Sequence, residues 1–252
     1  MPKPTIAIER RGAAAWLTLA RPLIDAAAIR ELREACGSLA GDAAVRAVVL
    51  TGAGDAFATG WDAAILRDVG ALREAGALGD PFGCLAELPK PVICAVNGDA
   101  LGGGLALALA ADIRIAAEGA RFGLPESDAG LLPAGGATQR LARLVGRGKA
   151  LELLLTGEAI DGSEALRIGL VSEVVPAGEL AARAQEIAER IAERGPLAVQ
   201  YAKEAVSRGL EMPLEQALRY ETDLTVILQT TEDRAEGVRA FIEKRKPKFK
   251  GK

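Results

Sequence analysis

The segment from residue 91 to residue 117 is the feature that most constrains the fold of this chain. It reads PVICAVNGDALGGGLALALAADIRIAA: an apolar strand pattern, three consecutive glycines, a run of small apolar residues typical of a buried helix, and a second strand pattern. Strands that alternate with helical patterns favour an α/β fold over one that segregates its helices and strands. Three adjacent glycines cost backbone entropy, so a packing or ligand requirement must offset that cost.

The same alternation precedes this segment. Residues 5–19 predict a β-hairpin that turns near Gly12, and residues 25–40 predict a helix. Residues 45–52 predict a buried strand that ends at a glycine. Because strand and helix patterns continue to alternate, the sequence predicts that the first part of the chain is one α/β core.

The C-terminal part of the chain has a different pattern. From Glu179 onward, four helical segments follow one another and are separated by glycine and proline. We therefore predict an α/β core over residues 1–190 and a helical region over residues 191–252. The helices of the second region are amphipathic, and we expect them to bury part of their apolar faces on other subunits.

Composition and charge exclude several classes of function. The net charge of −3 comes from interspersed acids and bases, so the chain lacks the basic surface that nucleic acid requires. No uncharged apolar stretch is long enough to span a bilayer, and the opening MPKPTIAIERRG lacks the apolar segment of a secretory signal. The three cysteines are scattered and lack metal-ligand spacing. We expect a cytoplasmic protein with no nucleic-acid partner, no membrane partner and no metal.

The chain contains no histidine. This absence excludes Ser-His-Asp and Cys-His nucleophile systems, imidazole bases and histidine-containing zinc sites from within the chain. Any general acid or base must therefore be Asp, Glu, Lys, Tyr or Cys.

The glycine triplet, Gly102–Gly104, does not fit the usual nucleotide-binding motifs. A dinucleotide fingerprint would need a further glycine at position 107, where Leu107 stands. A tight turn with close helix packing is one explanation of the triplet. The other is a ligand, because N–H groups at the start of a helix are unpaired, and a second strand running into glycine places another N–H near Gly60 and Trp61. Two converging N–H donors are what a thioester enolate oxyanion requires.

Five blocks of sequence, in order along the chain, resemble one family. They are GDAFATGWD, KPVICAVNGDALGGGLALALAADIRIA, FGLPESDAGLLPAGGATQRLARLVG, LLLTGEAIDGSEALRIGLVSEVVP and GVRAFIEKRKPKF. Over nearly its whole length the chain is similar to the crotonase superfamily, the enoyl-CoA hydratase/isomerase proteins. The resemblance implies a crotonase-like spiral of ββα units with a C-terminal helical region. It also implies a homotrimer or homohexamer, and an acyl-CoA thioester substrate that brings coenzyme A with it, without a separate cofactor.

The resemblance also assigns site residues. It implies that the backbone N–H groups of Trp61 and Gly103 bind the thioester oxygen, and that Glu126 transfers the proton. The Trp61 indole would narrow the acyl pocket. In the family, the positions of Phe241 and Lys244 reach coenzyme A from a neighbouring subunit or line the acyl end. The substrate-binding positions that the resemblance implies are Ala58, Gly60, Asp62, Leu101, Gly102, Pro133, Phe241 and Lys244.

Simpler explanations remain open at several of these positions. Glu126 follows Pro125, an ordinary place for a carboxylate at the start of a helix. Asp62 is better explained as the cap of the next helix than as a chemical group. Asp128 fits a solvated turn residue, and Lys244 fits a solvated lysine of a basic tail as well as it fits a phosphate contact.

One departure from the family leaves two functions open. Hydratases of the two-glutamate type carry their first glutamate at the position of Ala106, and some isomerases and dehalogenases use a third carboxylate at the position of Ala134. With Glu126 alone, the chain suits an isomerase, in which one base moves a proton between two carbons, or a hydratase whose water is held by other groups. The alternative is a homologue that binds acyl-CoA with little or no catalysis.

Overall fold

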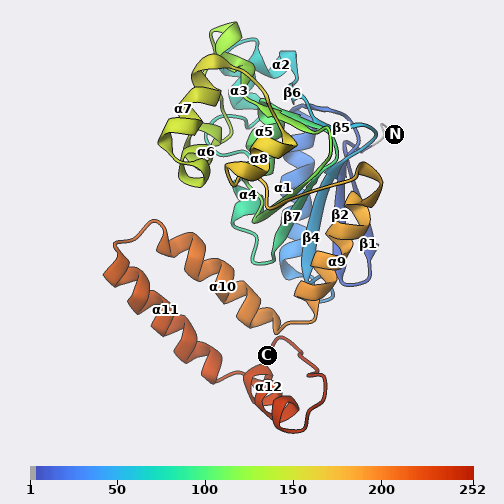
Figure 1. Cartoon of the computed structure of the whole chain (residues 1–252), viewed down its shortest axis with the longest axis vertical. Helices are drawn as coiled ribbons and strands as arrows, with labels where there is room; N and C mark the ends of the chain where they lie inside the picture. The colour runs from blue at the N-terminus through green and yellow to red at the C-terminus, as the bar shows by residue number, and fades with distance from the viewer. Residues whose placement is uncertain (1–3) are drawn as a thin grey trace.

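Six strands form the central sheet of the computed structural model, which describes residues 4–252 (Figure 1). The first two strands pair antiparallel, as the predicted hairpin over residues 5–19 requires, and every other neighbouring pair is parallel. Residues 1–3 of the opening segment lie outside the described residues. In spatial order the strands are β1 (Ile6–Arg11), β2 (Ala14–Leu19), β4 (Ala47–Gly52), β7 (Val92–Val96), β9 (Ile113–Ala117) and β12 (Glu173–Val175).

Two smaller sheets accompany the central one. The chain passes from β4 to β5, from β7 to β8 and from β9 to β10, and the strands keep the same relative order in the second sheet as in the first. Successive turns of the chain therefore add one strand to each sheet, which confirms the predicted spiral of ββα units. The second sheet has the order β11 (Ile160–Asp161), β10 (Arg121–Gly123), β8 (Asp99–Leu101) and β5 (Ala56–Ala58), and the third pairs β3 (Leu23–Ile24) with β6 (Gly60–Trp61).

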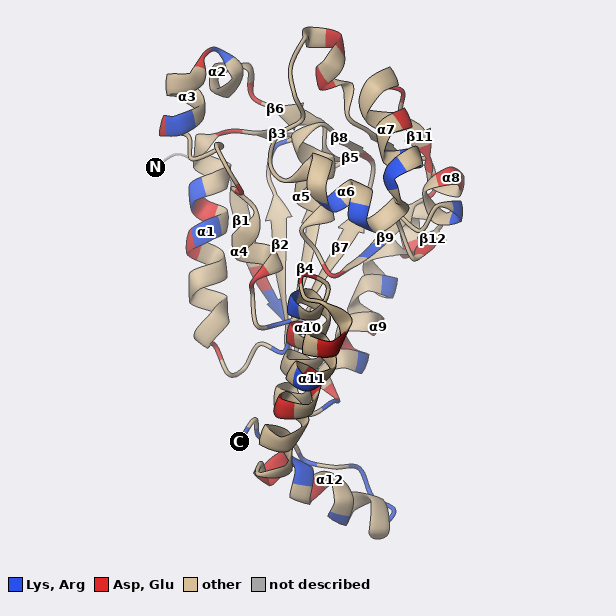
Figure 2. Cartoon of the chain, turned by 90° about the vertical axis from the view of Figure 1, so that its left-hand side faces the viewer, with Lys and Arg blue, Asp and Glu red and all other residues tan. Residues whose placement is uncertain are grey.

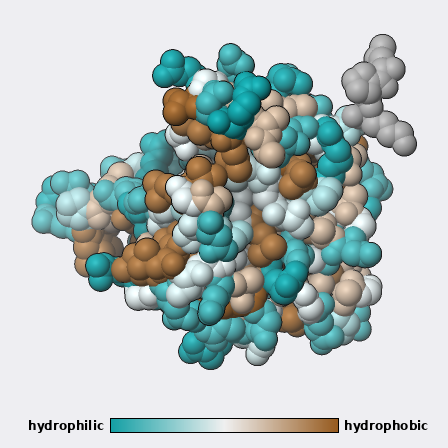
Figure 3. All heavy atoms as spheres, turned by 90° about the horizontal axis from the view of Figure 1, so that it is seen from above, coloured by the Kyte–Doolittle hydropathy of each residue, from teal (hydrophilic) through white to brown (hydrophobic). Residues whose placement is uncertain are grey.

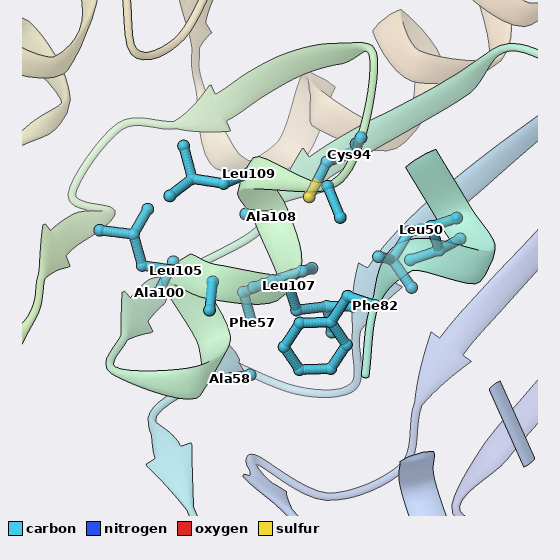
Figure 4. Close-up of a cluster of buried hydrophobic side chains, with 14 of the residues drawn as sticks. Leu50, Phe57, Ala58, Phe82, Cys94, Ala100, Leu105, Leu107, Ala108 and Leu109 are labelled. Carbon is cyan, nitrogen blue, oxygen red and sulfur yellow. The ribbon is translucent and has the colours of Figure 1, made fainter. Parts of the chain in front are cut away.

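The central sheet is covered on both faces. Its inner strands β4 and β7 read AVVLTG and VICAV, nearly continuous apolar runs of the kind that doubly covered parallel strands require. One face packs on the main core, to which α1 (Ala26–Gly41) and α5 (Gly103–Leu109) contribute. Figure 4 shows the side chains of α5 in this core together with Leu50 of β4 and Cys94 of β7. The other face packs on α9 (Leu180–Ala192). The domain boundary predicted between residues 190 and 191 falls in the last turn of α9.

α1 is the longest helix of the core, and the other core helices are shorter. α1 begins after Asp25, whose side chain accepts a hydrogen bond from Ala28 N at 2.7 Å, so the predicted helix over residues 25–40 is capped at its start. The remaining core elements are α2 (Ala63–Leu66), α3 (Val69–Glu74), α4 (Gly83–Ala86), the 3-10 turn η1 (Pro125–Ala129), α6 (Ala137–Val145), α7 (Arg147–Thr156), α8 (Gly162–Arg167) and the 3-10 turn η2 (Ala177–Glu179).

The Asn97 side chain links the ends of three strands. Its Oδ1 accepts a hydrogen bond from Gly52 N at 2.9 Å. Its Nδ2 donates to Gly54 O at 2.9 Å and to Ala56 O at 3.1 Å. These bonds join the end of β7 to the end of β4 and the start of β5, and they thereby fix the main chain just before the glycine triplet.

Three helices after the core form a C-terminal arm, residues 196–242. The arm consists of α10 (Pro196–Gly209), α11 (Leu214–Gln229) and α12 (Glu232–Ile242), and it extends away from the core in Figures 1 and 2. α10 contains no buried residue, and α11 contains only Leu224. Exposed large apolar side chains are frequent along the arm: Val206, Leu210, Leu214, Leu218, Val226, Ile227, Val238, Phe241 and Ile242.

The surface is mixed in character. Acidic and basic residues are interspersed in Figure 2, and Figure 3 shows small hydrophobic groups among hydrophilic ones at the end of the core. Within residues 4–252, no helix combines the length and the apolar composition needed to cross a bilayer. In the same residues, no group of three or more His, Cys, Asp or Glu side chains is placed to hold a metal ion.

Candidate active site

The glycine triplet joins β8 to α5. Gly102 has a φ of +51°, which favours glycine, and its N–H donates to Gly123 O at 2.9 Å, so the turn is bonded to β10. The first helical hydrogen bond of α5 runs from Ala106 N to Gly102 O at 3.0 Å. Gly103 lies in the first turn of α5, so its N–H has no helical carbonyl to bind. This N–H is a donor for an oxygen from outside the helix.

Each glycine of the triplet leaves space that another part of the protein occupies. A Cβ on Gly102 would lie 3.0 Å from Glu126 Oε1, and a Cβ on Gly103 would lie 2.7 Å from Cε2 of Trp61. A Cβ on the third glycine would overlap the carbonyl oxygen of Ala58. Close packing was one of the two explanations that the sequence left open, and the packing of these three neighbours already requires all three glycines.

The Trp61 side chain lies between Gly103 and Phe82. Its ring stacks on that of Phe82, with centroids 5.5 Å apart and 12° between the ring planes. Trp61 is 7% exposed, and its Nε1 is buried without a hydrogen-bond partner among residues 4–252. The indole therefore fills the space directly beside Gly103 and carries an unpaired donor there.

Gly60 and Trp61 form the short strand β6, in which Gly60 pairs with Leu23 and Trp61 with Ile24 of β3. The flanking donors, Thr59 N and Asp62 N, bond to Pro22 O at 2.7 Å and to Ile24 O at 2.9 Å. The φ of +146° at Gly60 favours glycine there. Asp62 Oδ1 then accepts a hydrogen bond from Ala64 N at 2.8 Å, which confirms the predicted helix cap.

Glu126 lies in η1, beside Gly102. It is 9% exposed, and both carboxylate oxygens are buried without a hydrogen-bond partner in the described part of the chain. Burial raises the pKa of this carboxyl above its ordinary value. An ordinary carboxylate at a helix start would be solvated, so that simpler explanation does not fit Glu126. Asp128, in contrast, is exposed, as expected of a solvated turn residue.

Apolar groups fill the space around Ala106, where two-glutamate hydratases carry their first carboxylate. Ala106 has an exposed fraction of 0%. A Cβ on Gly135 would lie 3.2 Å from the Cβ of Ala106 and 2.9 Å from Cε2 of Phe82. Ala134, the other position without a carboxylate, is partly buried against the same core. A longer side chain at position 106 would have to displace these neighbours.

A106E should therefore destabilise the protein instead of restoring a pair of carboxylates. Overpacking and an unpaired buried charge both disfavour the fold, and we expect the free energy of unfolding to fall by roughly 3 kcal/mol. Thermal unfolding and product analysis check this expectation. The control is A40E, which makes the same substitution on the exposed face of α1 and should leave the Tm nearly unchanged. An A106E protein with wild-type Tm and increased hydration activity would contradict the expectation.

The structure brings most of the predicted site residues together. A Cβ on Gly102 would lie 3.5 Å from the Cα of Gly60, so the two glycine segments meet. Leu101 is the last residue of β8, and Pro133 is buried next to Ala134. Ala58, Gly60, Trp61 and Glu126 are thus immediate neighbours of the glycine triplet.

Two predicted substrate-binding residues lie elsewhere in the chain. Phe241 is in α12 and is 85% exposed, and Lys244 follows the same helix. In Figure 1, α12 is at the opposite end of the molecule from α2 and α5. A single copy of the chain does not bring Phe241 or Lys244 to the glycine triplet.

Sequence reasoning missed two residues that shape the site. Phe82 stands in DPFGC, a segment without helical or strand periodicity, so no pattern identified its ring as the partner of Trp61. Asn97 gave a better signal, because it is a polar residue between a buried apolar strand and a glycine. Polar residues at such positions are commonly held by hydrogen bonds to nearby main chain.

The spiral core, the glycine triplet at the start of a buried helix and the isolated buried glutamate define a protein of the crotonase fold. The chain belongs to the enoyl-CoA hydratase/isomerase family, since the model of the family described as "Enoyl-CoA hydratase/isomerase" matches residues 9–252.

Similar proteins match over nearly their whole length. The short-chain-enoyl-CoA hydratase of Clostridium acetobutylicum is 42% identical over 249 residues, which cover 96% of this chain and 95% of that protein. The crotonyl-CoA hydratase of Syntrophomonas wolfei is 42% identical over 252 residues, 97% of each chain. The crystal structure of an enoyl-CoA hydratase from Bacillus anthracis has a TM-score of 0.93 and 40% identity, and the match covers 98% of this chain and 100% of that one. The family that the five sequence blocks indicated is confirmed.

Proposed function

We propose that this protein acts on the double bond of an enoyl-CoA and that Glu126 is its only proton-transferring side chain. The thioester oxygen binds between the backbone N–H groups of Gly103 and Trp61. Loss of a proton next to the thioester places negative charge on that oxygen, and two converging donors stabilise the charge. Glu126 takes the proton and later returns it.

The observation that carries this proposal is the state of the Glu126 carboxyl. Both of its oxygens are buried and unpartnered within residues 4–252, beside the glycine triplet. A structural carboxylate in such a place would be paired, because an unpaired buried polar group disfavours the fold. A carboxyl that receives and returns a proton must instead be free to contact a ligand, and the burial that raises its pKa suits both tasks.

Double-bond isomerisation needs only this one carboxyl. The carboxylate removes a proton from C2 of a 3-enoyl-CoA, and the electron pair of that bond moves into the thioester enolate. The double bond then forms between C2 and C3 as Glu126 returns the proton to C4. Atoms and charge balance without a second acid or a water molecule.

Hydration is the second candidate, since the relatives described above are named hydratases. Glu126 would accept a proton from water while the water oxygen adds to C3, and Glu126 would then return that proton to C2. In two-glutamate hydratases a glutamate at the position of Ala106 helps to hold this water. Because alanine stands there in this chain, other groups would have to orient the water. Because that glutamate is missing, there is a third candidate: a homologue that binds acyl-CoA with little or no catalysis.

The test combines binding with product analysis. Purified protein is titrated calorimetrically with a short acyl-CoA and with NAD, and it is assayed with trans-2-enoyl-CoA and 3-enoyl-CoA. We expect binding of the acyl-CoA, no binding of NAD, and conversion of at least one enoyl-CoA. Binding without turnover would support the acyl-CoA-binding homologue. Binding of NAD but not of acyl-CoA would overturn the proposal.

We also propose that the C-terminal arm assembles the chain into a trimer or a pair of trimers. The exposed apolar side chains of α10–α12 provide the surface that would become buried. In such an assembly, Phe241 and Lys244 would reach the substrate of a neighbouring subunit.

Sedimentation at micromolar concentration should therefore give the mass of three or six chains. Replacement of an exposed leucine of the arm, as in L210E, should shift the protein toward smaller species, whereas A40E on the core should not. A monomer at micromolar concentration would contradict the proposed assembly.

A further inference from the structure

The two tryptophans of the chain differ in how their indole N–H groups are paired. Trp16 Nε1 donates to Gln185 Oε1 at 2.8 Å. Trp61 Nε1 is buried and has no partner among residues 4–252. The only other buried side-chain polar atoms without a partner in that range are the two carboxylate oxygens of Glu126. The unpaired buried side-chain groups of the described chain are thus confined to two residues of the proposed site.

Both residues border the same turn of main chain. Trp61 Nε1 would lie 3.0 Å from a Cβ on Gly103, and Glu126 Oε1 would lie 3.0 Å from a Cβ on Gly102. The stack on Phe82 and the small exposed fraction of Trp61, 7%, hold the ring so that its N–H does not reach solvent. The N–H is therefore fixed at the site without an acceptor from the described protein.

No side chain among residues 4–252 accepts a hydrogen bond from Trp61 Nε1. The groups packed around it, Gly103, Phe82 and, beyond Phe82, Ala106 and Gly135, have no side-chain acceptor. Leaving a buried donor unpaired lowers an equilibrium constant by about 10-fold to 100-fold. An acceptor that arrives with the ligand would recover that factor.

We propose that Trp61 is a specificity-determining residue and that its indole N–H donates a hydrogen bond to an oxygen carried by the acyl group of the substrate. The inference rests on the proposed function, because the ligand is taken to be an enoyl-CoA. The alkene carbons are C2 and C3 in a 2-enoyl-CoA and C3 and C4 in a 3-enoyl-CoA, so this oxygen belongs to a carbon or group beyond the double bond. The substrate class is a short enoyl-CoA that carries a hydroxyl, carbonyl or carboxylate oxygen.

The size and polarity of the site support the same class. The Trp61–Phe82 stack occupies space beside Gly103, so the acyl group that fits there is short. An alkyl group would leave the indole N–H unpaired in the complex. A site built to hydrogen-bond an oxygen discriminates strongly against an analogue that lacks it.

Binding of unreactive ligand pairs tests the proposal. In 4-hydroxybutanoyl-CoA and pentanoyl-CoA, a hydroxyl replaces a methyl group, and in succinyl-CoA and 4-methylpentanoyl-CoA, a carboxylate replaces a branched alkyl end. We expect wild type to bind the oxygen-bearing member of at least one pair about 10-fold to 100-fold more tightly, as measured by calorimetry. W61F, which removes the donor, should reduce that ratio to near one. W16F, the matched control, should keep it.

A second measurement does not depend on the folding of W61F. The chain has two tryptophans, so W16F leaves the Trp61 indole N–H as the single signal of its kind in an NMR spectrum. Saturation with the preferred oxygen-bearing ligand should shift this signal downfield relative to its position with the alkyl partner. The same position with both members of each pair would overturn the proposal and would show that the N–H meets water or the thioester instead.

Failure of this inference differs from failure of the proposed function. If acyl-CoA binds and an enoyl-CoA is converted, but neither pair shows a preference that depends on Trp61, only the specificity role is wrong. If no acyl-CoA binds at all, the proposed function is wrong and the role of Trp61 falls with it.

Discussion

We expect E126Q to lower the turnover of the preferred enoyl-CoA by about 10²-fold to 10⁴-fold, the usual contribution of general acid–base catalysis. The amide keeps the shape of the side chain but can neither accept nor return the proton. In the proposed mechanism Glu126 acts on the proton and not on coenzyme A, so the dissociation constant of a saturated acyl-CoA should change little. Steady-state kinetics and calorimetry measure the two quantities separately.

D128N is the matched control for E126Q. It makes the same kind of change two residues away in η1, at an exposed carboxylate, and it should leave the rate unchanged. A wild-type rate in E126Q would remove Glu126 from the mechanism and leave the site without an identified base.

The raised pKa of Glu126 also determines how rate and stability depend on pH. The proton is abstracted by the carboxylate, so kcat/KM should rise as pH increases through the raised pKa. The folded protein binds this proton more tightly than the unfolded chain does. Wild type therefore loses stability as pH rises above the ordinary glutamate pKa of about 4.3. E126Q does not titrate, so its Tm relative to wild type should be higher at pH 7 than at pH 4.

We expect G103V to reduce turnover by about 10²-fold or more, the typical effect of losing one oxyanion donor. The first added carbon would lie 2.7 Å from the Trp61 ring, so the indole must leave its place on Phe82. The displaced ring and the valine side chain together disturb the position of the thioester between its two donors. Turnover measured at saturating substrate, on variants shown to be folded by circular dichroism, checks the expectation.

A matched glycine and a second variant separate the causes of this loss. Gly37 in α1 is exposed and has no atom within 4 Å of a Cβ position, so G37A should be neutral or slightly stabilising. If the indole is what excludes a side chain at position 103, G103A should destabilise wild type more than it destabilises W61A. A folded G103V protein with wild-type turnover would show that Gly103 serves packing alone.

Local patterns predicted the features that depend on neighbouring residues. Apolar runs predicted the buried strands, and Asp62 before an apolar segment predicted a helix cap. Each of these depends on residues within a few positions, or on a strand or helix period that the sequence displays directly.

Contacts between distant segments were not predictable in the same way. The stack of Trp61 on Phe82 joins the short strand β6 to a segment without periodicity, so no spacing rule relates the two rings. The hydrogen bonds of Asn97 reach residues more than 40 positions earlier. The requirement for all three glycines of the triplet likewise becomes apparent only when the neighbouring atoms are placed.

The contrast between the core and the C-terminal arm implies an order of folding. The central sheet pairs strands far apart in the sequence, such as β9 with β12, and contacts of this kind form slowly because long loops must close first. α10 and α11 are connected by a short turn and contact each other, so they can form within microseconds. They bury few side chains, however, and isolated helices of this length are marginal in water. We therefore expect closure of the sheet to set the folding rate, and we expect the helices of the arm to become stable only once they pack on other parts of the assembly.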